Sequence, residues 1–210
     1  MKKIIDVTFI LMGISYLLFI PDNQTTVNVI MKIIPIILLV VMTFLAHTSY
    51  TKWIRIGLVF SLIADGAIIF YFIAGLAFFL LAHLFYIRAF LLHKERKVPM
   101  HIGIPLILYA IAIGIWLVSH IWQDNLFLAF AVAVYVTVIF LMGWTAVQTN
   151  NKPAIIGAFL FILSDSVLGV NEFIFDVPFA RYILMVLYYS AQLFIATSVL
   201  TMGKRKRGIR

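Results

Sequence analysis

The chain has 210 residues, of which 64% are hydrophobic and 11% charged, and its mean hydropathy is +1.11. Soluble domains are about half apolar and a quarter charged, so this composition excludes an ordinary soluble domain and indicates a surface that contacts lipid. The lack of cysteine excludes disulfides and thiolate metal sites, and in so apolar a chain the net charge of +8 indicates membrane topology, not binding of nucleic acid.

Apolar segments separated by short polar breaks predict eight helices, each near the ~20 residues that a membrane span requires. They cover residues 4–20, 27–46, 53–70, 72–92, 102–121, 125–147, 153–175 and 179–202. No polar break separates the third span from the fourth, and we place the boundary at 70–72 because an unbroken helix over 53–92 would be far too long. The first segment starts like a signal peptide but lacks a small-residue cleavage site, so we expect a retained helix. The predicted fold is all-α, a polytopic membrane protein with a single transmembrane domain over 1–210.

Basic residues are concentrated in alternate connections between the predicted spans. All but two of the 16 lysines and arginines fall on the side that carries both termini. The exceptions are Arg181, on the opposite side, and Lys32, within the second span. By the positive-inside rule we expect both termini in the cytoplasm, with the basic tail 203–210 as an anchor that contacts membrane lipids. The chain is expected to be a multi-pass protein of the cell membrane.

Two aspartates lie deep within apolar spans. Asp65 in the third span and Asp165 in the seventh each come eight residues after a glycine, Gly57 and Gly157. An aspartate at the centre of a span costs about 2.5–3.5 kcal/mol on insertion scales, so such a residue indicates function. The following spans also correspond, since 82–85 aligns with 191–194. We therefore predict a duplicated architecture of four plus four helices, with halves 1–92 and 102–202 and a site at their interface. Chance similarity between apolar helices is the alternative.

Further polar residues share helix faces with the aspartates or lie at a similar depth. Lys32 lies in the second span, and Glu172 is two turns beyond Asp165 on its helix face. The candidates for substrate binding are Lys32, Ser61, Tyr86, Tyr188, Tyr189, Gln192 and Glu172, and His83 joins Asp65 and Asp165 as a catalytic candidate. We expect the two aspartates to face one cavity between the halves, joined by His83 and Gln192. The structural alternatives are a lysine that extends to the interface, tyrosines that only pack, and a core histidine.

Other catalytic motifs are absent from the sequence. The remaining histidines lie near helix ends and form no H-x-x-x-H pair, so the sequence does not indicate a multi-histidine zinc site. Neither a G-x-S-x-G elbow nor a P-loop occurs.

The site residues lie in segments that resemble the lysoplasmalogenase, or YhhN-like, family of membrane proteins. The resemblance extends from about residue 32 to 198 and includes a lysine-then-proline signature at Lys32 and Pro35. The matching segments are 32–36, 60–65, 75–90, 157–168 and 188–195. One departure is Ala64, where the family pattern has glycine or serine; this concerns packing more than chemistry.

This resemblance implies hydrolysis of the vinyl ether bond of a lysoplasmalogen, a lysophospholipid, to a fatty aldehyde and a glycerophospho-base. The reaction starts with protonation of the β-carbon, so it needs a carboxylic acid that keeps its proton near neutral pH. Burial and a second carboxylate both favour the protonated form. We expect Asp65 and Asp165 to supply the acid and its ionised partner, with His83 orienting one of them or relaying a proton. No metal or organic cofactor is expected.

Two other classes of function remain open at this point. A proton-coupled transporter also uses intramembrane aspartates and a repeated architecture. A lipid-binding or scaffold protein would need neither aspartate to ionise. The sequence leaves the headgroup preference, the physiological substrate and the oligomeric state undetermined.

Overall fold

The computed structural model describes residues 2–18 and 26–206, in which each of the eight predicted spans is a helix. The helices are α1 (Lys2–Leu18), α2 (Thr26–Thr43), α3 (Ser49–Phe70), α4 (Phe72–Leu91), α5 (Met100–Ile121), α6 (Leu126–Gln148), α7 (Lys152–Phe173) and α8 (Ala180–Lys206). Within the described ranges, the six helices α3 to α8 are long and apolar enough to cross a membrane, while α1 and the apolar part of α2 are shorter. The predicted all-α, polytopic fold is confirmed. The predicted break at 21–24 and the tail residues 207–210 lie outside the described residues.

The division between α3 and α4 falls at one residue, Tyr71, where we predicted it. Tyr71 has extended backbone angles (φ −140°, ψ 97°), and its N–H donates to the carbonyl of Ala67. Its own carbonyl accepts from the N–H of Gly75 in the next helix. A single extended residue therefore ends one span and starts the next without any polar break.

Two predicted helix ends were wrong because hydropathy does not detect caps. Helix α3 starts four residues before position 53, since the hydroxyl of Thr48 accepts the N–H of Thr51 and caps the helix there. Helix α2 ends three residues before position 46, and Arg55 donates to both the hydroxyl and the carbonyl of Thr43 at that end. At the other end of the chain, α8 continues to Lys206, into the predicted basic tail.

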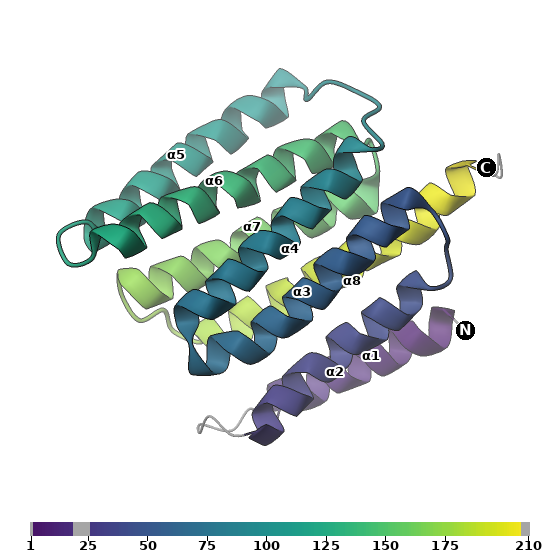
Figure 1. Ribbon diagram of the computed structural model, residues 1–210, viewed down its shortest axis with the longest axis horizontal. Coiled ribbons are helices and arrows are strands. Elements are labelled where there is room, and N and C mark those ends of the chain that lie inside the picture. The colour runs from purple at the N-terminus through teal and green to yellow at the C-terminus, as the bar shows by residue number, and fades with distance from the viewer. Residues whose placement is uncertain (1, 19–25, 207–210) are drawn as a thin grey trace.

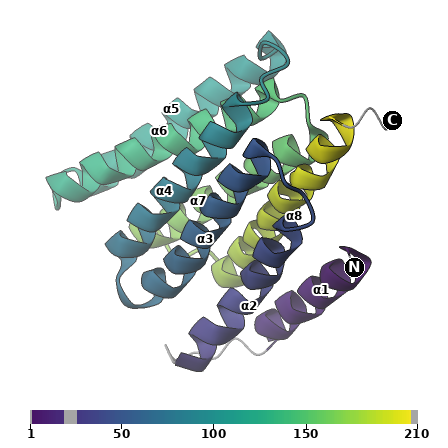
Figure 2. The ribbon, with the colours of Figure 1, turned by 45° about the vertical axis from the view of Figure 1, so that its right-hand side comes forward.

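Helices α3, α4, α7 and α8 form the centre of the bundle, with α1 and α2 on one side and α5 and α6 on the other (Figure 1). Helix α2 packs against α3 and α8, and α6 packs against α7 and α4. The neighbours of the second helix are thus equivalent in the two halves, as a four-plus-four duplication would produce. The start of α1 and the end of α8 lie at the same end of the bundle, which the turned view also shows (Figure 2). Duplication and membrane orientation remain predictions.

The two glycines that precede the aspartates occupy equivalent close contacts. A Cβ added at Gly57 would lie 2.3 Å from Cε1 of Tyr86, and one added at Gly157 would lie 2.8 Å from the carbonyl oxygen of Ala191. Both distances are shorter than real contacts, so each glycine lets α3 approach α4, or α7 approach α8. The repeated spacing therefore combines two roles: each glycine allows close packing of two helices, and each aspartate, eight residues later, supplies a carboxylate.

Candidate active site

Asp65, on α3, lies in a buried group of polar side chains. Only 1% of its side chain is exposed, and Lys32 on α2 places Nζ 3.1 Å from its Oδ1. The hydroxyl of Tyr188 on α8 donates to the other oxygen, Oδ2, at 2.6 Å. A buried carboxylate and a buried ammonium stabilise each other only when both are well paired, and this pair is joined to further hydrogen bonds.

A chain of hydrogen bonds leads away from Asp65 through the predicted binding residues. Gln192 Nε2 donates to the hydroxyl of Tyr188 at 3.2 Å, and the hydroxyl of Tyr86 donates to Gln192 Oε1 at 2.9 Å. Ser61 Oγ lies 3.3 Å from the same Tyr86 hydroxyl. Separately, Tyr189 donates to the backbone carbonyl of Lys32 at 2.9 Å. Six of the seven predicted binding residues therefore belong to this group.

Asp165 on α7 lies in a second group with different chemistry. The hydroxyl of Tyr135 on α6 donates to its Oδ2. His83 on α4 places Nε2 3.1 Å from the Tyr135 hydroxyl and 3.5 Å from Asp165 Oδ2. The side chain of Asp165 is 11% exposed, whereas that of His83 is fully buried. Asp165 is therefore held by a tyrosine and a histidine, without a permanently charged partner in this group.

Tyr135 is the residue of this group that sequence reasoning missed. A tyrosine in an apolar span has the same pattern as a packing residue, so nothing in its own helix distinguishes it. The signal lies in the duplication, because Lys32 and Tyr135 come from α2 and α6, the second helices of the two halves.

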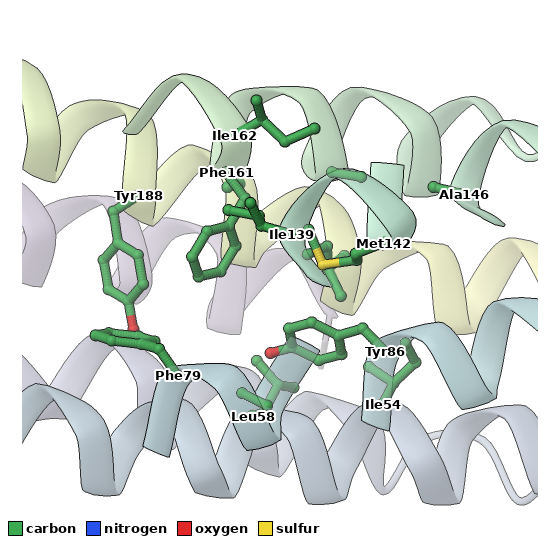
Figure 3. Close-up of a cluster of buried hydrophobic side chains, with 14 of the residues drawn as sticks. Ile54, Leu58, Phe79, Tyr86, Ile139, Met142, Ala146, Phe161, Ile162 and Tyr188 are labelled. Atoms are coloured by element: carbon green, nitrogen blue, oxygen red, sulfur yellow. The ribbon is translucent and has the colours of Figure 1, made fainter. Parts of the chain in front are cut away.

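Aromatic rings contact members of both groups, and Figure 3 shows three of these rings, those of Phe79, Phe161 and Tyr188. The ring of Phe161 is 4.7 Å from that of His83 and 5.5 Å from that of Tyr188, measured between centroids. Phe79 contacts both Phe161 and Tyr188. We expected His83 and Gln192 to join the two carboxylates, but His83 lies with Asp165 and Gln192 with Asp65. The reason is that Phe79 lies on the face of α4 that carries His83, and Phe161 lies on the face of α7 that carries Asp165. The two rings fill the space between the Asp65 group and the Asp165 group.

Each aspartate takes its partners from both halves of the chain. Asp65 of the first half contacts Tyr188 on α8, and Asp165 of the second half lies beside His83 on α4. The other partner of each comes from the second helix of its own half. Each group therefore takes side chains from both of the predicted halves, 1–92 and 102–202.

Asp165 also lines a small apolar cavity between α4, α5, α6 and α7. The cavity has a volume of about 30 Å³, and its walls include Leu76, Leu117, Tyr135 and Ile139. Asp65 is not among its lining residues. A space of this size holds about one water molecule. Most of the wall is apolar, so the carboxyl group of Asp165 faces a space in which a carbon atom of a lipid can approach it.

Glu172 stands apart from both groups. It is exposed near the end of α7, so its predicted part in substrate binding rests on its helix face alone. Among the described residues, no three His, Asp or Glu side chains are arranged to hold a metal ion.

Comparison with known proteins places these residues in a family. The model of the YhhN family matches residues 27–199. The chain is 30% identical to lysoplasmalogenase TMEM86A of Homo sapiens, over 88% of this chain and 83% of that protein. It is 32% identical to lysoplasmalogenase TMEM86B of Sus scrofa, over 94% of this chain and 87% of that protein, and 34% identical to the Mus musculus protein of the same name, over 90% and 82%. No solved structure matches the chain. A family model that covers all but the ends of the sequence, together with relatives aligned over most of their length, establishes that this multi-pass membrane protein belongs to the YhhN family.

Proposed function

We propose that this chain is a lysoplasmalogenase, an ether hydrolase that cleaves the vinyl ether bond of a lysophospholipid in the membrane. The proposal agrees with the names of the relatives, which are lysoplasmalogenases and do not favour a transporter. The observation that carries it is the position of Asp165, whose carboxyl group is fixed by Tyr135 on the wall of an apolar cavity. The products are a fatty aldehyde and a glycerophospho-base.

The first step is transfer of a proton from Asp165 to carbon. Because Tyr135 donates to Oδ2, that oxygen is an acceptor, and the proposal places the acidic proton on Oδ1. The π electrons of the vinyl ether take this proton at the carbon β to the ether oxygen. An oxocarbenium ion forms, and Asp165 becomes a carboxylate beside it.

In the second step water captures the cation. The water oxygen bonds to the carbon that carries the ether oxygen, and its proton passes to Asp165, which regains its acid form. The resulting hemiacetal breaks its bond to the glycerol oxygen, which takes the hydroxyl proton, and the aldehyde is released. One carboxyl group thus acts first as acid and then as base, as the acid–base residue of a retaining glycosidase does.

Asp65 has a different role in this proposal. Lys32 lies at one of its oxygens and Tyr188 donates to the other, and in this proposal Asp65 is the ionised carboxylate that interacts electrostatically with Asp165. A negative charge near the cavity favours the cationic intermediate. Tyr86, Tyr189 and Gln192 hold this charge in place, and His83 positions Tyr135.

The reaction is tested with purified protein in liposomes and a 1-alkenyl lysophospholipid as substrate. We expect release of a fatty aldehyde, measured with an aldehyde-specific hydrazine reagent. The matching ester-linked lysolipid should remain intact, because the chain has no sequence motif for an activated serine. Wild-type protein that is folded and releases no aldehyde would overturn the proposed function.

A further inference from the structure

The reaction requires a binding site for a hydrocarbon chain directly beside Asp165. The alkenyl chain starts at the double bond itself, so a carbon that receives the proton from Asp165 is followed at once by methylene groups. The 30 Å³ cavity is too small for them. The chain must therefore continue from the cavity into a larger space with apolar walls.

A larger apolar groove adjoins the cavity between α5 and α7. Its volume is about 580 Å³, and it shares Ile113 and Ser166 with the cavity wall. Ser166 directly follows Asp165, so the groove reaches to within one residue of the carboxyl group. Tyr109, Trp116 and Leu163 also line this groove, and each is 39–46% exposed, so the groove opens toward the lipid-facing surface of the bundle.

Helix α5 is the least enclosed of the six spanning helices. In the most apolar 18-residue stretch of α5, 22% is buried inside the bundle, compared with 33–50% in the corresponding stretches of the other five helices. Among the described helices α5 packs only against α6 and α7, at the edge of the bundle (Figure 1). Widening the passage between α5 and α7 consequently disturbs fewer contacts than moving any central helix.

We propose that the single hydrocarbon chain of the substrate binds in the groove between α5 and α7, with its vinyl ether end at Asp165. This assignment rests on the proposed function, and it adds the path by which the lipid enters from the side. An unbranched apolar chain suits the groove because its lining is almost entirely apolar. A second groove of about 540 Å³ between α5 and α6 also shares two residues with the cavity wall, Val136 and Phe140, but no residue of α7 lines it.

The test uses a saturated alkyl ether lysophospholipid that carries a photoreactive diazirine in the middle of its chain. This probe cannot be hydrolysed, so it reports binding independently of the reaction. After irradiation in liposomes, mass spectrometry should place adducts on residues of the α5–α7 groove such as Ile113, Trp116 and Val167. Excess unlabelled alkyl lysolipid should remove them, whereas a diacyl phospholipid should not.

Two tryptophan variants give the matched comparison. Val167→Trp fills the α5–α7 groove and should abolish the competed adduct, while Ile111→Trp, in the α5–α6 groove, should leave it unchanged. Competed adducts in the α5–α6 groove, or adducts spread over all lipid-facing helices without competition, would overturn the assignment. Both of these contrary results would be seen in the wild-type protein, so they do not depend on whether the Val167→Trp variant folds.

Aldehyde release measured on the same preparation separates the groove assignment from the proposed function. Release of aldehyde with adducts elsewhere would reject only the groove, and competed adducts in the groove without release of aldehyde would reject the hydrolase.

Discussion

The two aspartates occupy corresponding positions in the sequence but have different surroundings. Asp65 is enclosed, with a lysine and a tyrosine at its two oxygens. Asp165 faces a cavity, and its neighbours are a tyrosine and a histidine. In the proposed mechanism Asp165, which faces the cavity, is the acid, and Asp65, which is paired with Lys32, supplies the negative charge.

Replacing Asp165 removes the proton donor. We expect Asp165→Asn to lower the rate of aldehyde release by about 10²–10⁴-fold, the usual loss for one acid–base group. Asparagine preserves the shape and accepts from Tyr135 but has no acidic proton. The control is Asp124→Asn, at an exposed position, which should keep full activity. Near-normal hydrolysis by Asp165→Asn would contradict the mechanism.

Replacing Asp65 should affect stability as well as activity. Asp65→Asn leaves the ammonium of Lys32 buried without its counter-charge, and breaking such a pair costs about 3–5 kcal/mol. We expect a lower melting temperature in detergent and no hydrolysis. The double variant Lys32→Met with Asp65→Asn removes both charges and should regain stability without regaining activity. An active double variant would show that the pair is only structural.

Tyr135 should act through the carboxyl group that it contacts. Tyr135→Phe removes the hydroxyl that donates to Asp165 and lies beside His83. A hydrogen bond to a charged group contributes about 1.5–3 kcal/mol, so we expect kcat to fall roughly ten- to a hundredfold. KM should stay nearly constant, since the hydroxyl positions the acid and does not bind the lipid chain. Tyr182→Phe, at an exposed position of α8, is the matched control. A change in KM alone would indicate a role in binding instead.

At the scale of helices, the α3–α4 hairpin brings together three residues of the Asp65 group, Ser61, Asp65 and Tyr86. Tyr86 crosses α3 at Gly57, where no side chain intervenes, and its hydroxyl thereby reaches Gln192. The ring itself is packed among apolar side chains such as Leu58 and Met142 (Figure 3). The glycine therefore determines where the hydrogen-bond chain from Asp65 ends.

A methyl group at Gly57 should separate these helices. Gly57→Ala places Cβ 2.3 Å from the Tyr86 ring, and overpacking of this kind costs about 1–3 kcal/mol. Gly66→Ala is the control on the same helix, because its Cβ would lie an ordinary 3.7 Å from Val29. Differential scanning fluorimetry in detergent should show a lower melting temperature for Gly57→Ala only. Equal melting temperatures for the two variants would contradict the packing role.

At the scale of the whole molecule, the arrangement of basic residues predicts the orientation in the membrane. Both termini and the connection 93–101 should face the cytoplasm, because nearly all basic residues lie on that side. The chain has no cysteine, so single cysteines are specific labels. In intact cells an impermeant maleimide should label Gln123→Cys and leave Lys97→Cys unlabelled. The reverse pattern would invert the topology.

The sequence by itself determined the number of helices, the boundary at Tyr71 and most residues of the Asp65 group. These features are local, because hydropathy defines a span and the helical repeat defines which residues share its face. The ends of α2 and α3 that were predicted wrongly also depend on contacts between residues close in the sequence, those made by Thr48 and Arg55. A prediction that considers helix caps as well as hydropathy can include such contacts.

Only the tertiary structure decided which residues meet each aspartate. Tyr135, His83 and Asp165 come from three helices of two halves, and no sequence period relates their spacing. Phe79 and Phe161 share helix faces with the polar residues, but only the packing of the helices shows that their rings lie between the two groups. Hydropathy treats all surfaces of a membrane helix alike, and the side that a helix presents to a distant partner depends on the packing of the whole bundle. The different surroundings of Asp65 and Asp165 therefore followed from the contacts between helices.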